Sequence, residues 1–211
     1  MENLNNIMKK YFIDCGAHCG ESILMAKQKF GMDIHVISFE PIPHFANQIS
    51  EIYKDNDSVQ ISNSAIWIND KIKKIYVSTD ITDGSSLLGN AMNNLKSDIY
   101  IEIPCVDLSS WILNTFTNED YIILKLDIEG AEYEVLNKMI DDGSIKLIKE
   151  LWGEWHIDRM TDDHSLDLSK KIYKYLKDNQ LELKSWEIHI PTIGKSHPLL
   201  ANRPKTLKNL I

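Results

Sequence analysis

The sequence contains no apolar run near the roughly 20 residues that a membrane-spanning helix requires. Its first residues, Met1 to Asn6, also lack the character of a signal peptide. The three cysteines, Cys15, Cys19 and Cys105, are an odd number in a chain too long to need disulfides. Cys15 and Cys19 have no second cysteine pair that would complete a zinc site, so we interpret them as small turn residues. These absences predict a cytoplasmic protein with no membrane association.

Positive charge is also scarce, since 23 Lys and Arg face 31 Asp and Glu, for a formal net charge of −8. Nucleic-acid binding is driven by Lys and Arg contacts to phosphate, so the composition argues against a nucleic-acid partner. Two small basic groups, at 170–177 and 203–208, are better explained as solvated faces. With 211 residues and 43% hydrophobic content, the chain can bury a substantial core. We expect a single domain over residues 1–211.

Apolar periodicity in the first third predicts alternating strands and helices. The predicted strands are about 10–14, 34–39 and 59–63, with helices at about 20–30 and 43–54 between them. This alternation is typical of parallel strands joined by right-handed crossovers. The pattern then changes, because residues 65–68 and 74–77 flank the turn Asn69–Asp70 and predict a β-hairpin.

The second half of the chain returns to strands and helices. The predicted elements are a strand at 99–103, a helix at 108–115 capped by Asp107, a strand at 121–126, a helix to about 139, a strand at 147–152, a helix at 166–178 capped by Ser165, and a strand at 181–190. The segment 121–126 is the strongest strand and should be central. The fold class is therefore α/β, a Rossmann-like three-layer sandwich with a mostly parallel sheet and an added hairpin after the third strand.

Polar residues, mostly acids, follow nearly every predicted parallel strand. They are Asp14, Glu40, Asn63–Ala65, Asp127 and Glu154–His156. In open α/β sheets, ligands bind beyond the carboxyl ends of the strands. Helix capping explains any one of these residues but explains the whole set poorly. The set predicts a ligand site at this edge of the sheet.

The turn after the first strand indicates which ligand binds. Gly16 and Gly20 lead into a helix, as in nucleotide sites, and Glu40 ends the second strand, where an acid can bind both hydroxyls of a ribose. NAD, FAD and S-adenosylmethionine are the candidates. His18 occupies the middle glycine position, where a diphosphate would pass, and Asp14 would repel phosphate but accept hydrogen bonds from an ammonium. Both features favour S-adenosyl-L-methionine.

Residues 12–21, 39–41 and 124–132 resemble the FkbM-type S-adenosylmethionine-dependent methyltransferases, and the run Leu124–Glu132 is the most specific. The resemblance covers about residues 10–157 and implies a class I methyltransferase, in a family whose members often O-methylate sugars or other hydroxyl groups. It also implies cofactor contacts by the following residues: Asp14, Gly16, Gly20 and His18 at the methionine part, Glu40 at the ribose, and Ser64 and Ala65 near the adenine.

Methyl transfer to a hydroxyl requires removal of its proton, by a general base or by a divalent cation that lowers the hydroxyl pKa. Asp127, Glu154 and His156 are the candidate catalytic residues. His156 is the better base at neutral pH, whereas Asp127 with Glu154 would suit Mg²⁺ or Mn²⁺. Alternatively, Asp127 caps the following helix and His156 is structural. Glu132 is interpreted as a first-turn acid that complements the helix dipole.

The predicted acceptor is a carbohydrate or glycan hydroxyl. Trp155 is a candidate platform for sugar stacking, whereas Trp152 is assigned to the core. Residues 83–86 form either an acceptor-binding loop or an ordinary polar loop. A non-sugar small molecule is the alternative acceptor, and a non-catalytic α/β partner-binding module is the alternative protein class. A short chain without an acceptor domain also suggests association with glycosyltransferases.

Overall fold

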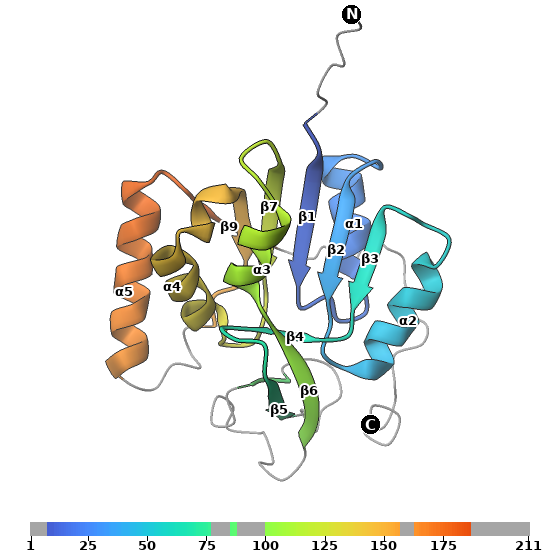
Figure 1. The fold of residues 1–211 in the computed structure, drawn as a ribbon, viewed down its shortest axis with the longest axis horizontal. Coiled ribbons are helices and arrows are strands. Elements are labelled where there is room, and N and C mark those ends of the chain that lie inside the picture. The colour runs from blue at the N-terminus through green and yellow to red at the C-terminus, as the bar shows by residue number, and fades with distance from the viewer. Residues whose placement is uncertain (1–7, 77–84, 88–99, 157–162, 187–211) are drawn as a thin grey trace, which may run out of the picture.

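The computed structural model describes residues 8–76, 85–87, 100–156 and 163–186. A six-stranded sheet forms the centre, with strand order β3-β2-β1-β7-β8-β9 (Figure 1). Its strands are β1 (Lys10–Cys15), β2 (His35–Phe39), β3 (Val59–Ser62), β7 (Tyr121–Leu126), β8 (Ile148–Gly153) and β9 (Leu183–Ser185). Every neighbouring pair in this sheet is parallel. The predicted mostly parallel α/β sheet is confirmed, with β7 in a central place.

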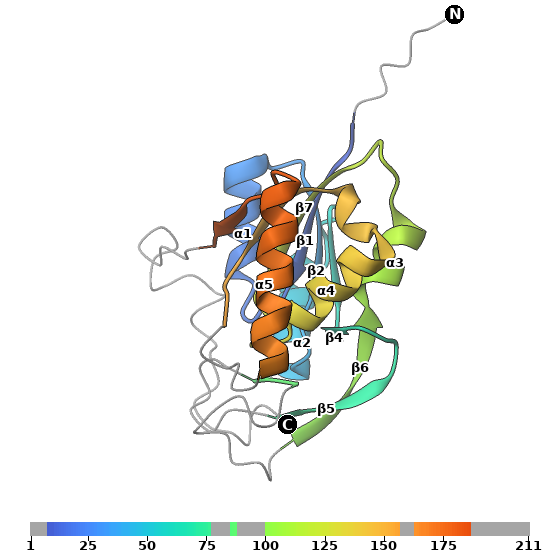
Figure 2. The ribbon, with the colours of Figure 1, turned by 90° about the vertical axis from the view of Figure 1, so that its left-hand side faces the viewer.

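Helices cover both faces of the sheet, as the three-layer prediction requires. They are α1 (Glu21–Phe30), α2 (Pro43–Tyr53), α3 (Leu108–Thr115), α4 (Glu132–Asp142) and α5 (Asp163–Asp178), with a 3-10 turn at Ser144–Leu147. Figure 2 shows α1 on one side of the sheet and α3 and α4 on the other. Because side chains alternate along a strand, Phe12 of β1 packs with α1, whereas Ile13 packs in the core that contains α3, α4 and α5.

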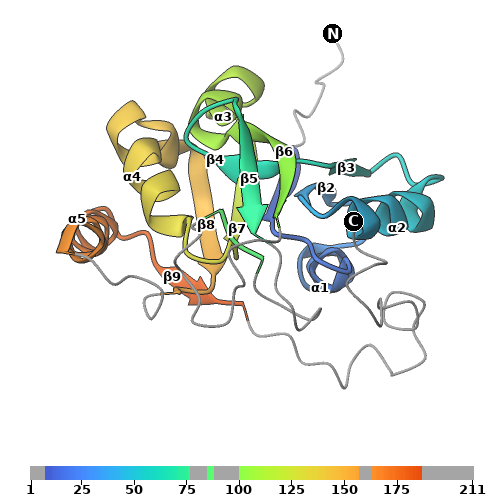
Figure 3. The same ribbon diagram turned by 90° about the horizontal axis from the view of Figure 1, so that it is seen from below.

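A second, three-stranded sheet lies beside the carboxyl edge of the main sheet (Figure 3) and corrects the hairpin prediction. Its members are β4 (Ala65–Trp67), β5 (Ile72–Tyr76) and β6 (Tyr100–Asp107). β4 and β5 do not pair with each other, because β6 lies between them, parallel to β4 and antiparallel to β5. The predicted turn instead binds β6, since the Asp70 carboxylate accepts a hydrogen bond from the Asp107 backbone N–H at 2.7 Å.

Helix boundaries agree with the sequence except at α5. Asp107 caps α3 as predicted, because its carboxylate accepts a hydrogen bond from the Ser110 N–H. The cap at Ser165 is wrong, since α5 begins at Asp163 and Ser165 lies within it. Aspartate, the residue type at position 163, is favoured in a first helical turn because its charge complements the helix dipole. The predicted strand 181–190 is only three residues long within the described part, and residues 187–190 lie outside that part.

Two further predictions concern the cysteines and the membrane. Cys15, Cys19 and Cys105 are all buried and form no disulfide, which agrees with the interpretation of Cys15 and Cys19 as small turn residues. Among the helices of the described residues, none has the length and apolar character to cross a membrane.

Candidate active site

The carboxyl ends of four parallel strands meet at one edge of the main sheet (Figure 1). Cys15 at the end of β1 pairs in register with Phe39 of β2 and with Leu126 of β7. Leu126 in turn pairs with Gly153 of β8. The residues that follow these four strands therefore lie next to one another. The structure thus brings the predicted residues at 14–20, 40, 127 and 154–156 to a single edge.

The turn after β1 is fixed by its backbone. Gly16 and Gly20 have φ angles of 88° and 86°, a left-handed conformation in which glycine carries no steric penalty. The Gly16 N–H donates to the Phe39 carbonyl at 3.0 Å, and a Cβ on Gly16 would lie 2.0 Å from the Asp127 carbonyl oxygen. Only glycine allows β1, β2 and β7 to meet so closely here. His18, whose φ of 48° is also left-handed, lies at the centre of the turn.

Glu40 holds this turn against the end of β2. Its carboxylate accepts hydrogen bonds from the backbone N–H groups of His18, at 2.7 Å, and Ile42, at 2.8 Å. Burial raises the pKa of Glu40 to about 8, although the two backbone hydrogen bonds oppose this shift. Each carboxylate oxygen retains capacity for a further hydrogen bond. Glu40 is thus an acceptor group at the position predicted for a ribose contact.

Asp14 has partners within the protein. Its carboxylate is fully buried, accepts hydrogen bonds from the hydroxyls of Ser22 and Ser38, and lies 3.1 Å from the ammonium of Lys125. We predicted that this carboxylate could bind the ammonium of a cofactor. In the structure, the ammonium beside it belongs to the chain itself, and contact with a cofactor stays a prediction. Sequence reasoning missed Lys125, although a charged residue within the most apolar strand was the available signal.

The predicted adenine side lies after β3. Ser64 and Ala65 are buried, and the Ser64 hydroxyl lies 2.9 Å from that of Ser62. The Asn63 side-chain amide donates to the carbonyls of Glu40 and Pro41, at 2.9 and 3.0 Å. These bonds hold the turn after β3 against the turn after β2, so the predicted adenine and ribose residues are neighbours.

His156 is the centre of a group of acids beyond β7 and β8. Its Nδ1 lies 2.9 Å from Glu132 Oε1. Its Nε2 lies 3.4 Å from a carboxylate oxygen of Glu129, 3.8 Å from one of Glu154 and 4.0 Å from one of Asp127. Burial lowers the pKa of His156, but the hydrogen bond and charge of Glu132, with the charges of Asp127 and Glu154, raise it above its ordinary value. All three predicted catalytic residues are therefore in one cluster.

Glu132 has a larger role than the one predicted for it. It is the first residue of α4, and its carboxylate accepts hydrogen bonds from the N–H groups of Ile128, at 2.8 Å, and Gly130, at 2.9 Å. With these bonds fixing both oxygens, Glu132 sets the orientation of the His156 ring. The alternative that Asp127 caps this helix is wrong, because the N-cap position of α4 is Ala131.

Three side chains of the cluster could hold a metal ion. Asp127, Glu129 and His156 each offer one ligand atom, and these atoms lie within 4.8 Å of one another. The group contains Glu129 where we predicted Glu154, whose side chain is 54% exposed. Glu129 adopts a left-handed φ of 61°, and its carbonyl accepts a hydrogen bond from the Ser86 hydroxyl at 2.7 Å. Of the loop predicted at 83–86, residues 83 and 84 lie outside the described part, and Ser86 borders this cluster.

Comparison with known proteins identifies the family. The model of the methyltransferase FkbM domain matches residues 14–179. The chain belongs to this family. The FkbM match includes the Gly16 turn, Glu40, Lys125 and the His156 cluster, and it confirms the resemblance given by the sequence motifs.

Among solved structures, the chain is similar to methyltransferase FkbM from Methylobacillus flagellatus KT, with 17% sequence identity and a TM-score of 0.45. The alignment covers 79% of this chain and 37% of that one, so this chain spans little more than a third of the length of the bacterial protein. No curated protein matches the sequence.

Proposed function

We propose that this chain is an S-adenosylmethionine-dependent O-methyltransferase that acts on a hydroxyl group of a carbohydrate or glycan. FkbM family membership supports methyl transfer. The observation that carries transfer to oxygen is the contact between His156 and Glu132, because a histidine held at Nδ1 presents Nε2 as a proton acceptor. This nitrogen lies 4.0 Å from Asp127, which follows β7 at the same edge of the sheet as the predicted cofactor residues.

The residues at this edge suit S-adenosylmethionine. Glu40 is an acceptor that fits the two donor hydroxyls of a ribose, and Ser64 and Ala65 would lie at the adenine. Gly16, His18 and Gly20 would border the methionine part. When bound, the cofactor supplies an electrophilic methyl group on a positively charged sulfur. The carboxylates of Asp127, Glu129 and Glu154 favour a cation at this edge, whereas they would repel the diphosphate of NAD.

The chain's own residues would then supply orientation and proton removal. The acceptor hydroxyl must lie within ~3 Å of the methyl carbon and in line with its bond to sulfur. Nε2 of His156 takes the hydroxyl proton, while Glu132 retains its hydrogen bond to Nδ1 and stabilises the charged ring. Glu154, at the more exposed side of His156, would orient the acceptor through a hydrogen bond to a second hydroxyl.

A divalent cation is a second means of activation, favoured by the three ligand atoms of Asp127, Glu129 and His156. Mg²⁺ or Mn²⁺ bound by Asp127 with Glu129 or Glu154 would lower the pKa of the acceptor hydroxyl. The two mechanisms compete for His156 Nε2, since a nitrogen that binds a metal cannot accept a proton. The base is the simpler proposal, because Lys125 already places an ammonium 3.4 Å from Asp127.

The proposal extends to the cell compartment and to the enzymes that would work with this one. Three buried cysteines that form no disulfide suit the reducing cytoplasm. A transferase that modifies glycans would work beside the glycosyltransferases that make them. A non-sugar small-molecule acceptor is the alternative substrate, and a non-catalytic partner-binding module is the alternative function.

Two measurements test this proposal. Isothermal titration calorimetry should show binding of S-adenosylmethionine and weaker binding of NAD, and the reverse order would refute the cofactor assignment. A screen of free and linked monosaccharides with methyl-labelled cofactor should then show label transfer to a sugar. His156→Ala is the control, because it removes the proton acceptor while leaving Glu40 in place. Label found on a nitrogen acceptor, or equal transfer by the His156→Ala variant, would contradict the proposed O-methylation by His156.

A further inference from the structure

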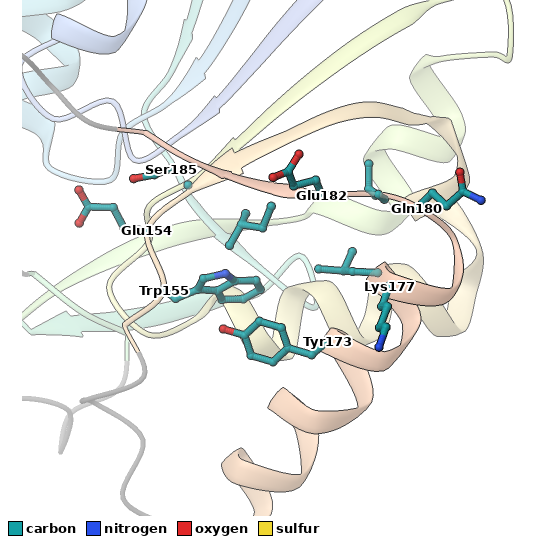
Figure 4. A pocket seen from close by; sticks show the side chains of 11 residues that line it. Glu154, Trp155, Tyr173, Lys177, Gln180, Glu182 and Ser185 are labelled. Carbon is teal, nitrogen blue, oxygen red and sulfur yellow. The ribbon is translucent and has the colours of Figure 1, made fainter.

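A pocket of about 740 Å³ lies between the end of β8, helix α5 and strand β9 (Figure 4). This volume is within the range of roughly 300–1,000 Å³ that is typical of small-molecule sites. Glu154 and Ser185 lie at one end, and Lys177 and Gln180 lie at the other. The pocket adjoins the candidate site at the end of β8 but does not include Glu40 or the glycine turn, because none of its lining residues comes from β1 or β2.

Two aromatic rings form one side of this pocket. Trp155 and Tyr173 lie with their ring centroids 5.5 Å apart and their planes at 45°. Trp155 also packs against Tyr133, at 5.0 Å between centroids, so its ring is supported from the core. Tyr173, on α5, is 47% exposed although it is a large aromatic residue. Rings fixed in this way offer apolar faces to a ligand without a further ordering cost.

The remaining polar side chains supply hydrogen bonds along the length of the pocket. Glu154 and Glu182 accept, Lys177 donates, and Gln180 and Ser185 do both. The charged side chains are two carboxylates and one ammonium, so the lining has an excess of negative charge, which disfavours a phosphorylated ligand and suits a neutral one. Aromatic faces combined with many mixed donors and acceptors match a sugar, whose C–H face is apolar and whose rim carries hydroxyl groups.

Glu154 connects this pocket to the catalytic cluster. It lines the pocket, and its carboxylate lies 3.8 Å from Nε2 of His156. An acceptor in the pocket therefore has one end beside the proposed base. The pocket also reaches Lys177 and Gln180 near the end of α5, and its volume of about 740 Å³ leaves room for more than one sugar ring.

We propose that this pocket is the acceptor site, and that it binds a neutral oligosaccharide or glycoside of at least two sugar units. The reacting hydroxyl lies at the Glu154 end, and the second unit stacks on Trp155 and Tyr173. This proposal rests on the proposed O-methyltransferase function and specifies its substrate class.

Saturation-transfer-difference NMR and titration test the site with defined probes: methyl glucoside, galactoside, mannoside and rhamnoside, and the disaccharides maltose, cellobiose and lactose. At least one disaccharide should bind about tenfold more tightly than its methyl monosaccharide. Tyr173→Ala should weaken that binding about tenfold, as expected for loss of an aromatic contact, and Tyr173→Phe should retain it. Lys174→Ala is the matched control on α5, since Lys174 pairs with Asp178 and does not line the pocket.

Two results would overturn this assignment. One is that no sugar in the panel binds. The other is that Tyr173→Ala and Gln180→Ala both leave sugar binding unchanged, because the sugar would then bind elsewhere. Calorimetry with S-adenosylmethionine on the same variants separates the two proposals. Variants that lose sugar affinity but keep cofactor affinity would support the acceptor site. If the parent protein does not bind the cofactor, the proposed function is refuted, and the sugar titrations still decide whether the pocket binds sugar.

Discussion

The ammonium of Lys125 lies 3.1 Å from the carboxylate of Asp14, and the two residues are direct neighbours in the register of β7 and β1. Both side chains are buried, with exposures of 1% and 0%. Lys125 also donates to the Gly16 carbonyl at 2.8 Å. Although burial lowers the pKa of Lys125, the charges of Asp14 and Asp127 raise it above its ordinary value, so it remains charged. This ion pair joins the two most specific motifs of the sequence into one network.

Removal of one partner of this pair should be costly. Lys125→Met leaves the Asp14 carboxylate buried without its counter-charge, and we expect a loss of about 3–5 kcal/mol in the free energy of unfolding. The double variant Asp14→Asn with Lys125→Met should lose less than the sum of the two single losses, because neither charge is then left unpaired. Urea denaturation of the four proteins measures the coupling. Additive losses would show that the pair contributes nothing as a pair.

The position of the candidate site at the carboxyl edge of the sheet was predictable, because it follows from the strand topology alone. Parallel strands with right-handed crossovers always bring their carboxyl ends together, so residues after β1, β2, β7 and β8 had to meet. The contacts that these residues make were harder to predict from the sequence. Whether Lys125 faces Asp14 depends on strand register, and whether Glu132 reaches His156 depends on where α4 begins relative to the end of β8. Local apolar periodicity determines neither the strand register nor the position of α4 relative to β8.

The hairpin error has a similar cause. Residues 65–68 and 74–77 alternate as two strands around a turn, and this pattern is the same whether they pair with each other or with a third strand. The eight-residue strand β6 offers two edges, and it pairs with β4 on one and β5 on the other. The pattern of residues 65–77 could not predict the pairing with β6, because β6 begins more than 20 residues later in the chain.

Glu40 should make cofactor affinity depend on pH. Its folded-state pKa is raised to about 8, so the carboxylate is mostly protonated at pH 7 and mostly ionised at pH 9. The ionised form accepts the ribose hydroxyls, so affinity for S-adenosylhomocysteine should increase about tenfold between these pH values. In Glu40→Gln, binding should be weaker and this pH dependence should vanish. Calorimetry across the range checks both, and an identical pH profile for the variant would contradict the role of Glu40.

The orientation of His156 by Glu132 should appear in the pH–rate profile. The Glu132 carboxylate raises the pKa of His156, and a base must be deprotonated, so kcat should rise with pH through a pKa above the ordinary histidine value. Glu132→Gln removes the charge, which should shift this limb to lower pH and lower the plateau of kcat roughly 10–100-fold.

Glu134→Gln is the matched control, because Glu134 lies in the same first turn of α4 but faces His164. Its profile should equal that of the parent protein. Thermal unfolding should accompany each measurement, since buried Glu132 also accepts two backbone hydrogen bonds. If Glu132→Gln lowers kcat without shifting the rising part of the pH–rate profile, Glu132 has a structural role only.

Activity should survive removal of divalent cations. The Lys125 ammonium is 3.4 Å from Asp127, so positive charge is already supplied beside one of the carboxylates that would bind a cation. We expect less than a twofold change in kcat after treatment with EDTA. Loss of activity that Mg²⁺ or Mn²⁺ restores would instead support a metal mechanism. Failure of that restoration in Glu129→Gln would then assign Glu129 as a ligand.

Gly16 and Gly143 have nearly equal φ angles, so substitutions at the two positions can distinguish backbone strain from a steric clash. Gly16 and Gly143 have φ angles of 88° and 83°, so alanine at either position pays the left-handed penalty of about 1–2 kcal/mol. A Cβ on Gly143 meets nothing within 4 Å, whereas one on Gly16 would lie 2.0 Å from the Asp127 carbonyl oxygen. Gly143→Ala should therefore lose only the strain energy, and Gly16→Ala should lose at least twice as much and also weaken cofactor binding. Urea denaturation with calorimetry measures both effects. Equal destabilisation by the two substitutions would mean that the turn after β1 can move away from β7, and that its close approach is not what shapes the cofactor edge.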